Sequence, residues 1–167
     1  MDLYLMRHAI AVARQDLNKD ASDRERPLTE KGIKKMRRAA KGLSKLKIGF
    51  DRILTSPLRR ARQTAEIVAN TLGIQGPRDE LEELAPESSP QKLISRIAGY
   101  PPGKLLLVGH QPLLGEIAAF LLKNTEAKVN LKKGGLCRIE LEDLSPEKAA
   151  ILHWMLTPKQ LRRLAGH

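Results

Sequence analysis

Short apolar runs alternate along the chain with segments in which apolar residues recur at helical spacing. The unbroken run Leu105–Val108 is typical of a strand that is buried on both faces of a sheet. Two further strand candidates occupy residues 3–6 and 52–55. Because helical segments separate these three runs, we expect them to form parallel strands of one sheet.

A different pattern near the C-terminus predicts an antiparallel edge to this sheet. Cys137, Ile139 and Leu141 alternate with charged residues, as they would in a half-exposed strand. Residues 150–156 form its expected antiparallel partner, across a turn at 144–146 that contains a Ser-Pro pair.

Apolar residues at helical spacing predict the helices between the strands. Ser56 is suited to cap the second helix, with Pro57 in its first turn, and Gly73 is suited to end it. The helical segments are 29–43, 57–72, 93–97, 113–122 and a short basic tail from residue 158. The expected fold class is therefore α/β, a three-layer sandwich with a mostly parallel sheet, an antiparallel edge and helices on both faces. A length of 167 residues favours a single domain over 1–167.

Composition adds a strong positive charge to this picture. Thirty Lys and Arg residues against 19 Asp and Glu give a formal net charge of +11. That charge suggests a polyanionic partner, but aromatic residues make up only 3% of the chain and offer little surface for stacking nucleic-acid bases. Hydrophobic residues make up 41%, which excludes a disordered basic tail.

Cys137 is the only cysteine, so the chain can form no internal disulfide and no multi-cysteine zinc site. A single thiol suits a reducing compartment. The first residues do not resemble a signal peptide, and no apolar stretch is long enough to span a bilayer. We therefore expect a cytoplasmic monomer with no membrane partner.

Polar groups of one kind follow each of the three parallel strands. Arg7-His8 follows the first, residues 55–60 follow the second, and Gly109-His110 follows the third. Carboxyl ends of parallel strands lie at one edge of a sheet, where α/β proteins hold their ligands. Imidazoles and guanidiniums gathered there repel each other unless an anion lies among them. A phosphoryl dianion fits this requirement, because arginines pair with its oxygens in a bidentate way.

Each of these residues also has a simpler interpretation when it is taken alone. His8 and His110 could be core histidines, and Arg60 could be a solvated helix residue. Their joint occurrence at successive strand ends argues against that interpretation but does not name a reaction.

Four segments resemble the motifs of the histidine phosphatase superfamily, which has the phosphoglycerate-mutase-like fold. They occur in the family's order, at 5–9 (LMRHA), 26–32 (RPLTEKG), 56–64 (SPLRRARQT) and 107–110 (LVGH). Within the superfamily, the chain most resembles the short SixA-type phosphohistidine phosphatases, which lack long insertions. Ala9 departs from the broad signature, which has glycine there, but it keeps a small residue at that position.

The resemblance implies a metal-independent phosphatase that uses no cofactor and forms a phosphohistidine intermediate on His8. Arg7, Arg60 and His110 would act in catalysis by holding the phosphoryl oxygens, and Arg26 would bind phosphate at the rim of the pocket. The family's phosphate ligand is the arginine directly before an alanine, which selects Arg60 over Arg59.

The family's proton donor is an acidic residue after the second arginine motif. Four carboxylates lie in segment 79–83, and the phrase Glu-Leu-Ala-Pro selects Glu83. This residue could equally be a solvated loop side chain.

Three alternatives remain open for the function. The substrate could be a small phosphorylated molecule rather than a phosphohistidine on a signalling protein. The basic stretch 31–47 could bind a polyanion, although such a charge run is more often a solvated helix face than a specific nucleic-acid site. A pseudoenzyme could bind phosphohistidine without cleaving it, but the intact set of arginines and histidines argues against this.

Overall fold

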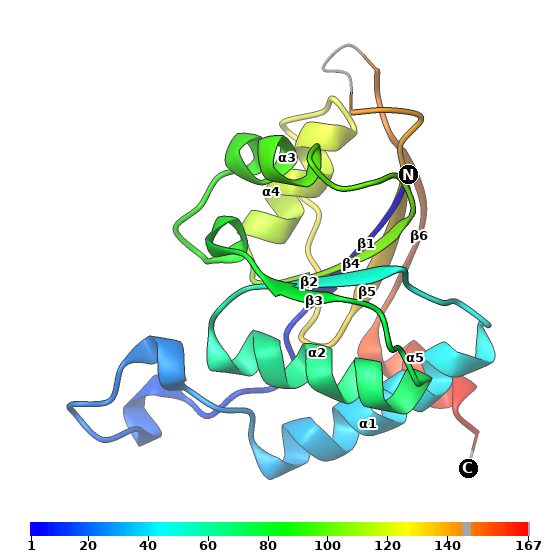
Figure 1. The fold of residues 1–167 in the computed structure, drawn as a ribbon. Helices are drawn as coiled ribbons and strands as arrows, with labels where there is room; N and C mark the ends of the chain where they lie inside the picture. The colour runs from blue at the N-terminus through cyan, green and yellow to red at the C-terminus, as the bar shows by residue number, and fades with distance from the viewer. Residues whose placement is uncertain (145–147, 167) are drawn as a thin grey trace.

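A six-stranded mixed sheet forms the centre of the computed structural model, which describes residues 1–144 and 148–166 (Figure 1). The strands run in the order β3-β2-β4-β1-β5-β6 across the sheet. The first four in this order are parallel, whereas β5 is antiparallel to β1 and β6 is antiparallel to β5. The strands are β1 Asp2–Arg7, β2 Arg52–Thr55, β3 Arg78–Glu80, β4 Lys104–Gly109, β5 Leu136–Glu140 and β6 Ile151–Leu156.

Helices cover both faces of this sheet. One face carries α1, α2 and α5, and the other carries α3 and α4 (Figure 1). The helices are α1 Glu30–Lys45, α2 Arg59–Leu72, α3 Pro90–Ile97, α4 Leu113–Leu121 and α5 Pro158–Leu164. Three 3-10 helices complete the described structure: η1 Arg14–Asp16, η2 Asp23–Glu25 and η3 Glu82–Leu84. The predicted α/β class, with its three layers and antiparallel edge, is confirmed.

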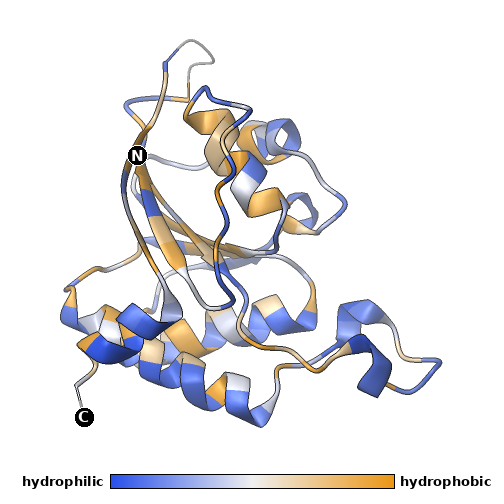
Figure 2. Cartoon of the chain, turned by 180° about the vertical axis from the view of Figure 1, so that it is seen from behind, coloured by the Kyte–Doolittle hydropathy of each residue, from blue (hydrophilic) through white to orange (hydrophobic). Residues whose placement is uncertain are grey.

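The alternation of side chains along β1 builds two hydrophobic cores from one strand. Leu3 and Leu5 pack on the side of α3 and α4, whereas Tyr4 and Met6 pack on the side of α1, α2 and α5. Burying a large apolar side chain contributes roughly 1.5–3 kcal/mol relative to leaving it exposed. Figure 2 shows the same division, with hydrophobic residues along the strands and hydrophilic residues on the outer turns of the helices. This burial fixes β1 and β4 at the centre, and their carboxyl ends with them.

The ends of the helices follow the predicted signal at Gly73 and depart from the predicted signal at Ser56. Thr29 caps α1, because its Oγ1 accepts a hydrogen bond from the backbone N–H of Gly32 (2.9 Å). Gly73 ends α2 with a left-handed φ of 67°. The predicted N-cap at Ser56 is wrong, because α2 begins at Arg59 and the capping position is Leu58. The Ser56 hydroxyl instead lies in the group of polar residues described below.

Gly42 lets α5 pack directly on α1. A Cβ atom at this position would lie 1.7 Å from the carbonyl oxygen of Leu161 in α5, which is far inside van der Waals contact. The absence of a side chain therefore allows the two helices to form one layer.

β6 forms the antiparallel edge of the sheet, and several of its side chains are exposed. The predicted turn at 144–146 that leads to it lies mostly outside the described residues. Within the described ranges, no helix is both long and apolar enough to cross a membrane.

Candidate active site

The carboxyl ends of β1, β2 and β4 are held together by backbone hydrogen bonds. The N–H of His8, directly after β1, donates to the carbonyl of Gly109 at the end of β4 (3.0 Å). The N–H of Ser56, directly after β2, donates to the carbonyl of Val108 (2.9 Å). The parallel register therefore brings the residues that follow three strands to one place, as the sequence predicts.

His8 is buried, with 6% of its surface exposed. Its Nδ1 lies 2.7 Å from the carbonyl oxygen of Ala9. Because a carbonyl oxygen can only accept, Nδ1 must carry the proton in this contact. The lone pair of the neutral ring is then on Nε2, the nitrogen that could attack an electrophile.

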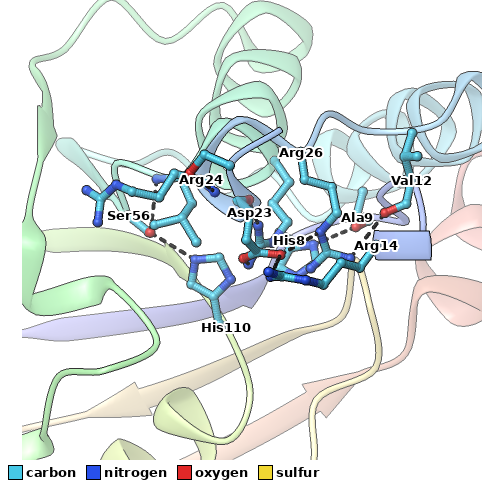
Figure 3. Close-up of polar contacts among 12 residues, drawn as sticks. His8, Ala9, Val12, Arg14, Asp23, Arg24, Arg26, Ser56 and His110 are labelled. Atoms are coloured by element: carbon cyan, nitrogen blue, oxygen red, sulfur yellow. Dashed lines mark hydrogen bonds and ion pairs between the residues drawn. The ribbon is translucent and has the colours of Figure 1, made fainter. Parts of the chain in front are cut away.

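His110 lies beside His8, with 5.0 Å between the ring centroids. Its Nε2 makes a hydrogen bond of 2.8 Å with the hydroxyl of Ser56, which Figure 3 shows as a dashed line. Its Nδ1 is buried and has no hydrogen-bond partner among the described residues. One nitrogen of the ring therefore remains available for a ligand.

Both imidazoles are held in the neutral form. Burial lowers the pKa of His8 to about 3, and the positive charges of Arg60 and Arg7 act in the same direction. Burial also lowers the pKa of His110 to about 3, with further contributions from His8 and the same arginines. A neutral His8 can act as a nucleophile, whereas His110 needs an adjacent anion before it becomes protonated.

The guanidiniums of Arg7 and Arg60 enter the same group of residues. Arg7 Nη1 donates to the carbonyl of Leu131 (2.9 Å), which holds the side chain across the loop before β5. Arg60 is 3% exposed, although its neighbour Arg59 is exposed to solvent. Burial lowers the pKa of Arg7 and Arg60, but a guanidinium has so high a pKa that both keep their charge at neutral pH.

Asp23 supplies the negative charge to this group. Its carbonyl oxygen and its Oδ2 accept hydrogen bonds from Arg60 Nη1 (2.8 Å) and Nη2 (3.1 Å). Its Oδ1 lies 3.1 Å from Nε of Arg26 and 3.6 Å from Nη1 of Arg14. Figure 3 shows this carboxylate among the arginine side chains, so η2 provides an internal counter-ion.

Sequence reasoning missed Asp23, because it lies in a polar segment in which apolar residues show no periodic spacing. The sequence did contain one signal for such a residue. Several arginines gathered at the strand ends need a carboxylate of the protein to limit their repulsion while no anionic ligand is bound. Sequence reasoning also missed Thr64, a fully buried residue of α2. Its Oγ1 accepts from the N–H of Ala9 (3.0 Å) and donates to the carbonyl of Arg60 (2.7 Å), which ties the residue after His8 to the helix that carries Arg60.

Donors exceed acceptors in this group of residues. The Nε atoms of Arg7 and Arg60 are buried, and neither has a hydrogen-bond partner within the described ranges. Together with Nδ1 of His110, these atoms belong to three side chains that can donate to an anion. Buried donors of this kind usually have partners, so the donor set fits an oxyanion such as phosphate.

Glu83 lies in η3, which is held beside the same strand ends because the N–H of Leu81 donates to the carbonyl of Thr55 (2.9 Å). Glu83 is half-buried, and no hydrogen bond or ion pair joins it to another residue that the structure describes. Glu83 and Glu87 line one shallow hollow on the surface. Burial lowers the pKa of Arg60, and the charges of Asp23 and Glu87 oppose this effect. The structure thus brings His8, Arg7, Arg60, His110 and Arg26 together and leaves Glu83 at their margin.

Within residues 1–144 and 148–166, no group of three or more His, Cys, Asp or Glu side chains is arranged to hold a metal ion. His153 lies away from the strand ends on β6, where its Nε2 pairs with Oε2 of Glu140 (2.5 Å). Cys137 is buried in the core, and burial raises the pKa of its thiol to about 12.

Comparison with known proteins places the chain in a family. Residues 3–86 match the model of the histidine phosphatase superfamily (branch 1). An uncharacterised protein of Picosynechococcus sp. is 45% identical over 141 residues, which cover 81% of this chain and 82% of that protein. The phosphohistidine phosphatase SixA of Escherichia coli is 27% identical over 97% of each chain.

Solved structures agree with this placement. The structure of the protein histidine phosphatase SixA complexed with tungstate has a TM-score of 0.81 and 28% identity, and the match covers 96% of this chain and 99% of that one. The α-ribazole phosphatase of Shigella flexneri has the same fold, with a TM-score of 0.76, 21% identity and coverage of 95% and 97%. The chain therefore belongs to the histidine phosphatase superfamily.

Proposed function

We propose that this chain is a protein phosphohistidine phosphatase and that His8 is its nucleophile. The observation that carries the proposal is the hydrogen bond between Nδ1 of His8 and the carbonyl of Ala9, because it leaves the lone pair on Nε2. This nitrogen belongs to a site whose other polar side chains are mostly donors. The similarity to SixA supports the choice of phosphohistidine as substrate.

In the first step, Nε2 of His8 attacks phosphorus and the bond from phosphorus to the substrate's imidazole nitrogen breaks. The electron pair of that bond stays on the departing imidazole, whose ring takes up one proton. In the second step, water attacks phosphorus, the bond to Nε2 breaks and orthophosphate leaves. An imidazole departs more readily than an alkoxide, so the demand on an acid is small. Glu83 is our candidate for the proton transfers.

Arg7, Arg60 and His110 would hold the phosphoryl oxygens, with Arg26 at the rim. These groups would supply the charge stabilisation without a metal ion, because their charges and dipoles are already in place before the substrate arrives. A bound dianion would also raise the pKa of His110 and favour its protonated, donating form. The related protein SixA forms a complex with tungstate, which is also an oxyanion, and this supports the proposal.

Asp23 would keep the arginines in place until the phosphoryl group binds. Its carboxylate neutralises part of their charge in the free protein and limits their mutual repulsion. A dianion that enters the site adds a second negative centre, which the unpartnered donors of Arg7 and Arg60 would bind.

The substrate class is tested by comparing turnover of a phosphohistidine-bearing protein domain with turnover of phosphorylated metabolites under the same conditions. We expect the highest kcat/KM on the phosphohistidine domain, and His8→Ala protein prepared in parallel gives the background rate. A metabolite hydrolysed with much higher kcat/KM would instead identify a small-molecule phosphatase.

The role of Arg60 is tested by a pair of neighbouring substitutions. Removing a buried donor from the phosphate site should lower kcat/KM by about 10²–10³-fold in Arg60→Ala. Arg59→Ala is the matched control, because Arg59 is exposed one residue away, and its activity should stay close to that of the wild type. Equal losses in the two variants would show that Arg60 does not hold the phosphoryl group.

The neutral histidines should make stability depend on pH. The folded protein holds the pKa of both His8 and His110 at about 3, whereas an unfolded histidine has a pKa of about 6.5. Between these values the unfolded chain binds protons that the folded chain does not, so the free energy of unfolding falls as the pH falls.

At pH 5 each neutral histidine should cost roughly 2 kcal/mol of stability relative to pH 8. Denaturant unfolding of His110→Asn should therefore show a smaller loss between these two pH values than the wild type. His153→Asn removes an exposed histidine outside the site and serves as the control. An unchanged pH dependence in His110→Asn would contradict the neutral state of His110.

A further inference from the structure

The positive charge of the chain is concentrated in two helices. α1 and α5 together hold ten Lys and Arg residues and one acidic residue, Glu30, and so carry a charge of +9 out of the net +11. The two helices form one layer, and Figure 2 shows hydrophilic residues along their outer turns. The rest of the chain is close to neutral, so this layer needs an explanation of its own.

Several arginines elsewhere in the structure have acidic partners. Arg52 pairs with Asp79 at 2.6 Å, and Arg138 pairs with Asp2 at 2.9 Å. The arginines around Asp23 pair with that carboxylate. By contrast, in the part of the chain that the structure describes, no ion pair joins any of the ten cations of α1 and α5 to an acid. The layer therefore has charge to offer to an external anion.

Two of these ten cations differ from the others in burial. Eight are exposed, whereas Lys35 of α1 and Arg162 of α5 are half-buried. Both line a crevice of about 140 Å³, together with Lys133 from the loop before β5. No acidic residue lines this crevice, although three cations from three separate segments do. Like charges brought together in this way repel each other unless an anion lies between them.

The crevice lies directly beside the phosphate site. Ala9 and Ile10, the two residues after His8, form part of its wall. The loop that carries Lys133 is fixed to the same strand end, because the N–H of Gly134 donates to the carbonyls of Arg7 (2.9 Å) and His8 (3.1 Å). Burial is the main cause of the low pKa of His8, and the charge of Lys133 adds to it. Lys133 therefore lines the crevice and also influences the charge state of His8 in the phosphate site.

We propose that Lys35, Lys133 and Arg162 bind a second anionic group of the substrate, a carboxylate or a phosphate, next to the phosphoryl group that is transferred. The proposal rests on the phosphatase function proposed above. On a protein substrate, the second group is an Asp or Glu side chain near the phosphohistidine. On a small substrate, it is a further carboxylate or phosphate. The chemistry is the same in both cases, and the substrates used in the test distinguish them.

The test uses phosphohistidine peptides in which one Glu is placed in turn at each position that flanks the phosphohistidine, each compared with its Gln counterpart. At low salt, the wild type should prefer the best Glu peptide in kcat/KM by about five- to tenfold, as expected for charge-assisted contacts in a half-buried crevice. In Lys35→Gln/Arg162→Gln this preference should disappear. Lys133 is left unchanged because its charge reaches His8.

The matched control is Lys41→Gln/Lys45→Gln, which removes the same charge from the far part of α1. It should keep the preference, because these side chains do not line the crevice. Hydrolysis of 4-nitrophenyl phosphate, which has no second anionic group, should be unchanged in both double variants. An equal loss of preference in the control variant would show general electrostatic steering and would overturn the crevice as a binding site.

A second pair of substrates, phosphoglycolate and ethyl phosphate, differs by one carboxylate and tests the small-molecule case. A preference for phosphoglycolate that is lost in Lys35→Gln/Arg162→Gln supports the crevice even if no peptide is hydrolysed, in which case only the protein substrate proposed above fails. If no substrate is turned over, calorimetric binding of the same two compounds gives the same comparison. The absence of any preference, for peptides and for small compounds, would overturn the proposal.

Discussion

The structure depends on holding several positive and proton-binding groups out of water at the end of a parallel sheet. Two nearly buried histidines and the buried guanidinium of Arg60 share this space, and each charged group makes the protonation of its neighbours less favourable. Asp23 limits the repulsion by accepting two hydrogen bonds from Arg60. The remaining imbalance, more donors than acceptors, is the property that would make the site selective for a phosphoryl dianion. The sheet supplies the rigidity, because β1 and β4 are packed on both faces and cannot shift their ends independently.

The same electrostatic principle operates differently in the layer formed by α1 and α5. Around Asp23, arginines form ion pairs with a carboxylate of the protein itself. In the layer formed by α1 and α5, no acid among the described residues pairs with the cations, so these can bind external anions. Most of them are exposed and well hydrated, so they contribute to solubility and to long-range attraction of anions that weakens with salt. Only Lys35 and Arg162 are partly withdrawn from water beside the strand ends. The net charge thus has two parts, a diffuse one and a local one next to the reaction.

Much of the fold could be predicted from the sequence because its strands are read from local patterns. The run Leu105–Val108 is buried on both faces as predicted, and the sequence motifs identify the residues that follow the strands. Contacts between segments far apart in the chain could not be predicted. Asp23 meets Arg60 across 37 residues, and Ser56, which fits a helix cap in the sequence, makes a hydrogen bond with His110 instead. The first pairing follows from the packing of α2 against η2, for which no periodic pattern exists. The second follows from the parallel pairing of β2 with β4.

The central claim is that Nε2 of His8 carries the phosphoryl group between the two steps. The most direct measurement is a rapid quench during turnover of a phosphohistidine substrate, followed by mapping of protein-bound phosphate by mass spectrometry. The account predicts phosphate that is labile in acid and stable in base on the peptide that contains His8, and none in His8→Ala. Turnover without any trapped phosphate on His8, or with phosphate trapped on another residue such as His110, would contradict it.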